Sequence, residues 1–428
     1  MLYNSRTLYD AFENPSQKAF SADSSFKYAF NFFIPVMATN GSISGPATNF
    51  FRKLLFENTT DLKQIDPLEI KANIVNVNTN IYLAMFRVFT DVNYNTEMGI
   101  SWQIKNDTYA TVANAAIALL DNENLFTPGT NYITALNGNS YSQLYHQFSF
   151  TYGKTFSDNR KIALGIKLSY LSGINYDAIE TKDTYIKSDD VSLKLHTDGF
   201  YRSSHPYKSF NQNNIKDWLA PDFKNPGFAV TLSANFKLRK GWYLMTNIKD
   251  LGFIYWANAY EYKAKPFNFQ LYPTPYNTTL ADYMGNQLSD YLNRKSIISP
   301  INGKVEILVN KNLGAYQPNF ILSKNILYPG GDVVLVNNYR FQNFILSASI
   351  GYNTNYALQL GMQAMIKSPN FEFFLGSNQL IRTYRSINGL MTHNIGLNKG
   401  TIDTSIYLGL GIKFGRVVYH QANSPYVP

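Results

Sequence analysis

The chain of 428 residues contains no cysteine, which excludes disulfide bonds, thiolate metal sites and catalysis by a thiol. This absence favours an oxidising compartment, where unpaired thiols are a liability. No run of about 18 apolar residues is present, so no transmembrane helix is expected. Charged residues make up only 16% of the chain. The formal net charge is +9, but the lysines are scattered and form no basic patch, so nucleic acid is not an expected partner.

Aromatic residues are abundant, at 15% of the chain, yet the mean hydropathy is only −0.23. Both values are expected when apolar residues occupy every second position of strands. The segment "IYLGLGIKFG" shows this pattern, because Ile406, Leu408, Leu410, Ile412 and Phe414 share one parity. Successive side chains of a strand point to opposite faces, so one face of this strand is continuously apolar.

The same alternation recurs along most of the chain. It is seen in segments 26–34, 98–105, 147–154, 161–171, 227–237, 344–353 and 357–367. A soluble β-sandwich also has alternating strands, but its outer face should be rich in charge. Here the second face consists of Gly, Ser, Thr, Ala, Asn and Gln with isolated lysines. Strands of nine to eleven residues fit a tilted bilayer span. We therefore predict an all-β transmembrane antiparallel barrel of about fourteen strands.

The connections differ in length at the two ends of the predicted barrel. Short turns are expected near Asp158, Gly241, Asn353 and Pro369, and long loops over 173–225 and 263–300. This asymmetry is typical of bacterial outer-membrane barrels. Helices are expected at Asn49–Asn58 and at Asp107–Asn124, with Asp107 as the N-cap. We predict one domain, with a lumenal or periplasmic segment over 1–24, the barrel over 25–416 and a tail over 417–428. A signal peptide is expected to have been removed before Met1.

The segment "NPGFAVTLSANFKLRKGWYLMTNIKDLGFIYWA", Asn225 to Ala257, resembles the hallmark of an uncharacterised family of Bacteroidota outer-membrane proteins. "IALGIKLSYLSGI", 162–174, resembles its upstream hairpin, "FEFFLGSNQLI", 371–381, its penultimate strand, and "AFENPSQKAF", 11–20, its N-terminal segment. The resemblance implies a fourteen-stranded barrel related to FadL and PorV. Such barrels are transporters of hydrophobic compounds or accessory subunits of secretion and barrel-assembly complexes.

Two sets of side chains follow from the parity of the strands. The aromatic residues near strand ends are expected at the membrane interfaces; they are Tyr152, Tyr170, Phe236, Trp242, Tyr352 and Phe414. The lysines of the opposite parity are expected to face the lumen; they are Lys27, Lys105, Lys167, Lys237, Lys367 and Lys413. A ring of lysines at one height would select anions. Alternatively, each lysine pairs with a lumenal carboxylate or with water.

No catalytic or cofactor site is predicted. His146, three residues before Ser149, and His393 lack a local nucleophile, base and orienting group. His196, His205 and His420 are expected in loops or the tail. The acidic clusters 188–190 and 121–124 lack the spacing of a calcium loop, so no metal site is predicted.

Two functions remain open, and both place the chain in the outer membrane in contact with lipid and lipopolysaccharide. The first is a non-enzymatic accessory or structural subunit of an envelope complex, in type IX secretion or barrel assembly, whose Tyr- and Asn-rich loops 201–214 and 269–285 contact other proteins. The alternative is a FadL-like transporter of hydrophobic molecules with a plugged lumen. A kinked strand that opens sideways to lipid would favour the transporter.

Overall fold

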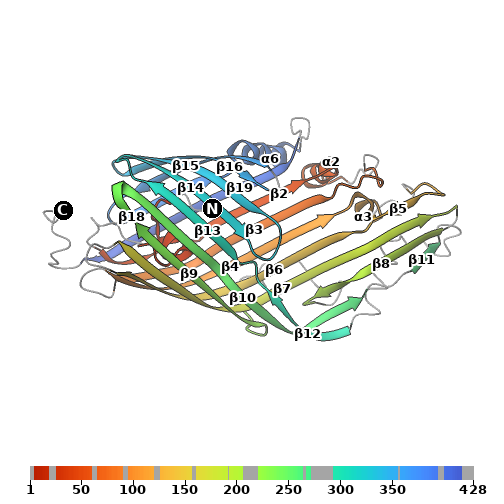
Figure 1. Cartoon of the computed structure of the whole chain (residues 1–428), viewed down its shortest axis with the longest axis horizontal. Coiled ribbons are helices and arrows are strands. Elements are labelled where there is room, and N and C mark those ends of the chain that lie inside the picture. Colours follow the sequence, from red (N-terminus) through yellow and green to blue (C-terminus); the bar gives the residue numbers. More distant parts are fainter. Residues whose placement is uncertain are drawn as a thin grey trace.

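The computed structural model of the chain describes residues 4–18, 26–59, 65–89, 95–119, 126–156, 161–190, 192–205, 220–263, 267–270, 293–354, 357–393 and 400–416. Over these residues, the chain is a closed antiparallel β-barrel of 14 strands, so the predicted fold class is confirmed (Figure 1). Two of the barrel strands consist of two labelled pieces each, because both pieces pair with a shared neighbouring strand.

The barrel strands follow one another around the wall in chain order. They are β1 (Phe26–Phe30) with β2 (Val36–Ser44), β3 (Asn73–Phe89), β4 (Thr96–Val112), β6 (Gly138–Phe156), β7 (Ile162–Ser188), β9 (Pro226–Lys237), β10 (Trp242–Lys263), β12 (Asn293–Pro300) with β13 (Lys304–Lys311), β14 (Tyr316–Asn325), β15 (Gly331–Phe341), β16 (Phe344–Asn353), β17 (Ala357–Lys367), β18 (Phe371–Ser377) and β19 (Ile402–Arg416). The last strand closes the barrel by pairing with β1 and β2.

The alternation in the sequence corresponds to the inside and the outside of this wall. Along β19, Ser405, Tyr407 and Lys413 are buried, whereas Leu408 and Phe414 of the other parity are at least partly exposed. The same holds along β9 and β16. A closed sheet leaves no unpaired edge strand, as a membrane-spanning sheet requires. The apolar outer face is therefore the surface that faces lipid.

The sheet continues far beyond the barrel at one end, where the sequence predicts long loops (Figure 1). The predicted loop 173–225 is wrong in its first part, because β7 runs on to Ser188 and pairs with β8 (Ser192–Ser203). The predicted loop 263–300 likewise contains β11 (Phe267–Gln270) and β12. The short β5 (Asn131–Ile133) also pairs with the far part of β7. Residues 206–219 and 271–292 of the two predicted loops lie outside the described residues.

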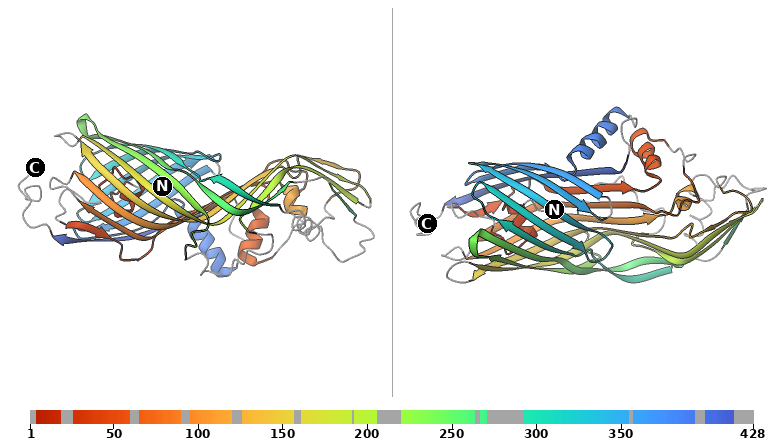
Figure 2. Two further views of the ribbon diagram at one scale, coloured as in Figure 1. Left: turned by 90° about the horizontal axis from the view of Figure 1, so that it is seen from below. Right: turned by 45° about the horizontal axis from the view of Figure 1, so that its top comes forward.

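The helices lie either inside the lumen or at the end of the barrel that has the long connections (Figure 2). α2 (Thr48–Arg52) and the π-helical turn η1 (Lys53–Glu57) confirm the predicted helix Asn49–Asn58. The second predicted helix is wrong over 107–112, because these residues complete β4. Only α3 (Asn114–Leu119) is helical there, and 120–124 lie outside the described residues. α1 (Leu8–Glu13) is in the N-terminal segment. No described helix is long and apolar enough to span a membrane.

The helix α6 (Leu380–Thr392) was not predicted, and β18 ends at Ser377 rather than continuing to Ile381. Because β18 is short, it pairs with β19 only up to Tyr407. The next part of the β19 edge is satisfied by α6. The Thr383 hydroxyl accepts from the Ser405 N–H at 2.9 Å, and the Ser386 hydroxyl donates to the Asp403 carbonyl at 3.2 Å. α6 thus completes the wall where the thirteenth strand stops.

Candidate functional site

The lumen is occupied by the N-terminal segment, of which residues 4–18 are described. Thr7 and Asp10 form a capping box at the start of α1, and all six residues of α1 are buried. The Leu8 N–H donates to the Glu372 carboxylate of β18 at 2.5 Å. On the other side of the lumen, the Asn247 side chain donates to the Glu13 carbonyl at 2.8 Å. The segment is therefore held from opposite walls.

Two wall glycines allow this segment to approach the sheet closely. A Cβ atom at Gly165 would lie 2.2 Å from the Ser16 nitrogen, and one at Gly153 would lie 2.3 Å from the Pro15 carbonyl oxygen. Contacts this short are impossible for a real side chain. These positions therefore require glycine for packing against the N-terminal segment rather than for a turn.

An ion network joins α1 to the wall. Glu13 accepts from the Lys249 ammonium at 2.9 Å, from the Tyr82 hydroxyl at 2.8 Å and from the Asn80 amide at 3.0 Å. Lys249 also lies 2.8 Å from the Glu306 carboxylate of β13. Because buried charges are tolerated only when paired, this geometry fixes the position of the α1 C-terminus.

A β-bulge in β10 places a second carboxylate beside this network. The register with β9 shifts between Ile248 and Leu251, and Asp250 has φ of 51°. The bulge turns the adjacent side chains of Lys249 and Asp250 both inward, where both are buried. The Asp250 carboxylate accepts from Lys105 at 2.5 Å and lies 3.4 Å from the Lys167 ammonium. Strand parity alone would place only one of these two neighbours in the lumen.

A third buried ion pair fixes the other side of the segment. Arg87 of β3 is 1% exposed and donates to Glu97 of β4 at 2.6 Å. Its remaining nitrogens donate to the carbonyl oxygens of Ala11 and Pro15. One guanidinium therefore joins two wall strands to the lumenal segment.

The six predicted lumenal lysines do not have one common environment. Lys105 and Lys167 share Asp250, and the Lys413 ammonium lies 3.9 Å from the Glu372 carboxylate. Lys367 donates to the carbonyl oxygens of Ser5 and Arg6. Lys27 and Lys237 are exposed. Three of the six thus have carboxylate partners, which corresponds to the alternative in which each lysine pairs with a lumenal carboxylate or with water. The six lysines do not form a single ring of positive charge at one height.

The six predicted interface aromatics occupy outward positions of the wall. Tyr170, Trp242, Tyr352 and Phe414 are 36–55% exposed, and Tyr152 and Phe236 are partly exposed. The end of the barrel with the short turns contains four of them, Tyr152, Phe236, Trp242 and Phe414, and the other end contains Tyr352. Tyr170 is the cross-strand partner of Phe148 on β6 and of Phe228 on β9.

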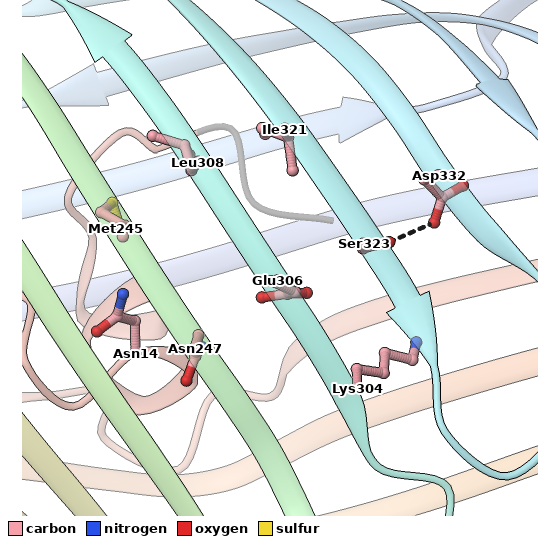
Figure 3. A pocket seen from close by; sticks show the side chains of 9 residues that line it. All are labelled: Asn14, Met245, Asn247, Lys304, Glu306, Leu308, Ile321, Ser323 and Asp332. Carbon is pink, nitrogen blue, oxygen red and sulfur yellow. Dashed lines mark hydrogen bonds between the residues drawn. The ribbon is translucent and has the colours of Figure 1, made fainter.

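Part of the lumen has an apolar lining, in contrast to the polar interior of a porin. Leu8, Tyr9 and Phe12 of α1 belong to one buried cluster with inward side chains of the wall. The wall members of this cluster include Val36, Tyr82, Met85, Leu308, Ile321, Val334, Val336, Ile345, Met365 and Phe374. Figure 3 shows the adjacent cavity of about 50 Å³, whose lining changes from Leu308 and Ile321 to the polar Glu306 and Asp332.

The wall is interrupted beside this apolar lining. The predicted strand 26–34 stops at Phe30, and pairing resumes only at Val36. Phe32 and Phe33 adopt left-handed φ of 50° and 59°, which bulky residues rarely do, and are 48% and 66% exposed on the outside. The Asn31 amide spans the break: it donates to Ile34 and Leu83 carbonyls at 2.9 and 3.1 Å and accepts from the Met85 N–H at 2.8 Å.

The histidines make structural contacts in the part of the chain that the structure describes. His146 accepts from the Trp102 indole at 3.0 Å, and His393 lies 2.9 Å from the Phe56 carbonyl oxygen. His196 stacks on Tyr185. His205 lies beside Ser204, and burial lowers the pKa of its imidazole below the ordinary value. His420 lies outside the described residues.

Metal ligation has no support within the described ranges, where no group of three or more potential ligands is found. In the predicted acidic cluster 188–190, Asp189 accepts from the Ser192 N–H at 2.7 Å in the β7–β8 turn. The cluster 121–124 lies outside the described residues.

Comparison with known proteins gives a family and a set of similar folds. A model of a family of unknown function, DUF5723, matches residues 19–378. No curated protein matches the sequence. Among solved structures, a deletion mutant of the TodX monoaromatic hydrocarbon channel has a TM-score of 0.47 at 7% identity and covers 94% of both chains. The toluene transporter TodX of Pseudomonas putida has 0.44 at 7%, covering 95% of this chain and 93% of that one. A FadL homologue of Pseudomonas aeruginosa has 0.43 at 8%, covering 91% of both.

Proposed function

Because this chain belongs to DUF5723, a family of unknown function, we propose a function from its own geometry. The protein is a non-enzymatic barrel of the bacterial outer membrane that transfers a hydrophobic small molecule or lipid between its lumen and the bilayer. The names of the similar channel and transporter structures agree with this proposal.

The interrupted first strand carries the proposal. A continuous strand would close the wall with a ladder of backbone hydrogen bonds. At this break one backbone bond to β3, from the Asn31 N–H to the Met85 carbonyl at 3.3 Å, is supplemented by the three bonds of the Asn31 side chain. Lipid-facing Phe32 and Phe33 lie on the outer side, and Met85 of the apolar lumenal cluster lies at the break on the inner side. Apolar surface is therefore present on both sides of this interruption of the wall, as passage of an apolar molecule requires.

A cross-linking experiment tests this route, since the natural chain has no cysteine. Phe30 and Phe86 are direct cross-strand partners immediately below the break. Cysteines at Phe30 and Phe86 are within disulfide reach. The matched control places cysteines at Leu335 and Ile350, an outward pair of β15 and β16 far from the break.

The assay measures entry of oleate and of toluene into vesicles that contain the purified protein. We expect entry above that of protein-free vesicles, a loss of about tenfold (~1.4 kcal/mol in the barrier) on oxidation of the Phe30–Phe86 pair, and recovery on reduction. The Leu335–Ile350 pair should show no such change. Entry of both compounds no faster than into protein-free vesicles would contradict transport, and an unchanged rate in the oxidised Phe30–Phe86 pair would contradict this route.

The accessory-subunit function is a second candidate, favoured by the sheet that projects beyond the barrel. This extension, formed mainly by β7, β8, β11 and β12, exposes Ile133, Ile179 and Tyr185. Exposed apolar side chains on such a projection suit contact with another protein. Affinity purification from native membranes separates the candidates: a stoichiometric partner that is lost when Ile133, Ile179 and Tyr185 are changed to serine supports the subunit, and a protein that purifies alone contradicts it.

A further inference from the structure

The helix α6 has the opposite orientation to that of an ordinary surface helix. Its buried positions are the small Thr383, Ser386 and Gly389, which face the edge of β19. Its large apolar residues point outward and are 41–77% exposed; they are Leu380, Ile381, Tyr384, Ile387, Leu390 and Met391. Exposed apolar residues at this spacing form a continuous stripe along the helix.

This stripe continues the lipid-facing surface of the barrel. α6 contacts β17, β18 and β19, and outward Leu358 and Leu360 of β17 are 49% and 42% exposed. Leu54 and Leu55 of η1, which also contacts α6, are exposed as well. The helices lie together on the outside of the barrel at the end with the long connections (Figure 2). This is the extracellular end in outer-membrane barrels, so the apolar stripe meets the outer leaflet.

A basic pocket of about 70 Å³ lies between α2, η1 and α6. Three arginines line it: Arg52 of α2, and Arg382 and Arg385 of α6. Arg52 is 3% exposed; its terminal nitrogens donate to Asn49 and to the Gly400 carbonyl, but its Nε has no hydrogen-bond partner among the described residues. A buried donor without a partner is costly, which points to a ligand that accepts from it.

The residues that line the pocket carry an excess of positive charge. Arg382 pairs with the Asp403 carboxylate, which does not line the pocket, and the described lining residues include no carboxylate. Arg52 and Arg385 therefore leave two positive charges without a neutralising partner in the described lining. The planar guanidinium group suits bidentate binding of phosphate oxygens.

We propose that this pocket binds the phosphate group of an outer-leaflet glycolipid of the lipid A type, whose acyl chains lie along the apolar stripe of α6. The cavity holds more than the ~10–15 Å³ that one water requires, and so admits a small oxyanion. Burial of the chains against α6 supplies the apolar contact that a free anion lacks. The inference depends on the proposed outer-membrane location and not on transport, so a failed transport assay leaves it unaffected.

Arg385→Gln provides the test, because Arg385 is exposed and its loss leaves the Arg52 and Arg382 contacts intact. The matched control is Arg239→Gln, the same change at an exposed arginine in the turn at the opposite end of the barrel. Binding of purified lipid A to the detergent-solubilised protein is measured by native mass spectrometry. The other probes are lipid A from which both phosphates have been removed, and inorganic phosphate.

We expect Arg385→Gln to weaken lipid A binding about tenfold relative to both the natural chain and Arg239→Gln. Dephosphorylated lipid A should bind the natural chain about as weakly as lipid A binds Arg385→Gln. Equal losses in the two variants, or equal binding of both lipids, would overturn the proposal. Displacement of lipid A by millimolar inorganic phosphate would show that the pocket takes the free anion and would overturn the assignment to lipid.

Discussion

Asp250→Asn tests the role of the β10 bulge in stabilising the filled lumen. Asn tolerates the left-handed backbone of Asp250 almost as well as Asp does, so the substitution removes the charge without straining the chain. Lys167 has a side-chain exposure of 1% and Lys105 of 13%, and both lose their carboxylate partner. Removing one partner of a buried ion pair costs about 3–5 kcal/mol, and we expect a loss of that size in the free energy of unfolding.

The assay is urea unfolding of the protein in lipid vesicles, followed by tryptophan fluorescence. The control is Asp332→Asn, since the Asp332 carboxylate accepts from neutral groups, Ser323, Asn353 and Gln359. Loss of charge there should cost only about 1 kcal/mol, because the hydrogen bonds are retained in weaker form. Equal losses in the two variants would refute the importance of the Lys105–Asp250–Lys167 group.

Further predictions concern the lumenal segment, the helix in the wall and the break. Gly165→Ala should displace the segment at Pro15 and speed amide exchange over 8–17, whereas Gly41→Ala, with nothing within 4 Å of its added Cβ, should not; equal exchange would contradict the packing. Thr383→Val should cost about 1–3 kcal/mol in urea unfolding, since the Ser405 N–H loses its acceptor; an unchanged midpoint would contradict this. Asn31→Ala should raise the rate of oleate entry, because two side-chain hydrogen bonds to β3 and one to Ile34 within the break are lost; an unchanged or lower rate would count against the route.

The sequence was sufficient to predict the barrel, because alternate residues of a strand face the lumen and the lipid, and these two environments select different residue types. The residues of β19 show this most clearly, as the inward and outward sets differ in burial as their spacing predicts. The extension could not be predicted, because strands outside the bilayer have no lipid face, and their Tyr- and Asn-rich composition matches that of loops. The parity rule also fails where the backbone is irregular, as at the bulge that turns Lys249 inward beside Asp250 and at the break after Phe30.

The lumenal contacts could not be predicted from the sequence for a different reason. Lys105 and Asp250 are 145 residues apart, and Glu13 and Lys249 are 236 apart, so no local spacing reports the pairing. α6 was missed because its small polar positions face the protein and its apolar positions face outward, and the strand pattern that precedes it gives no sign of a helix. The arginine pocket combines α2 with α6, which only the closure of the barrel brings together.

The most direct test of the account is the contact between hydrocarbon and the outer face of the wall. Single cysteines in the otherwise cysteine-free chain allow spin labels at Leu408 and Ile387 on the outside and at Ser405 on the inside. In vesicles, Leu408 and Ile387 should be strongly relaxed by oxygen, which concentrates in the bilayer, and weakly by a water-soluble nickel chelate. Ser405 should be protected from both. Strong relaxation of Leu408 by the nickel chelate would mean that water covers this face, and would contradict the account.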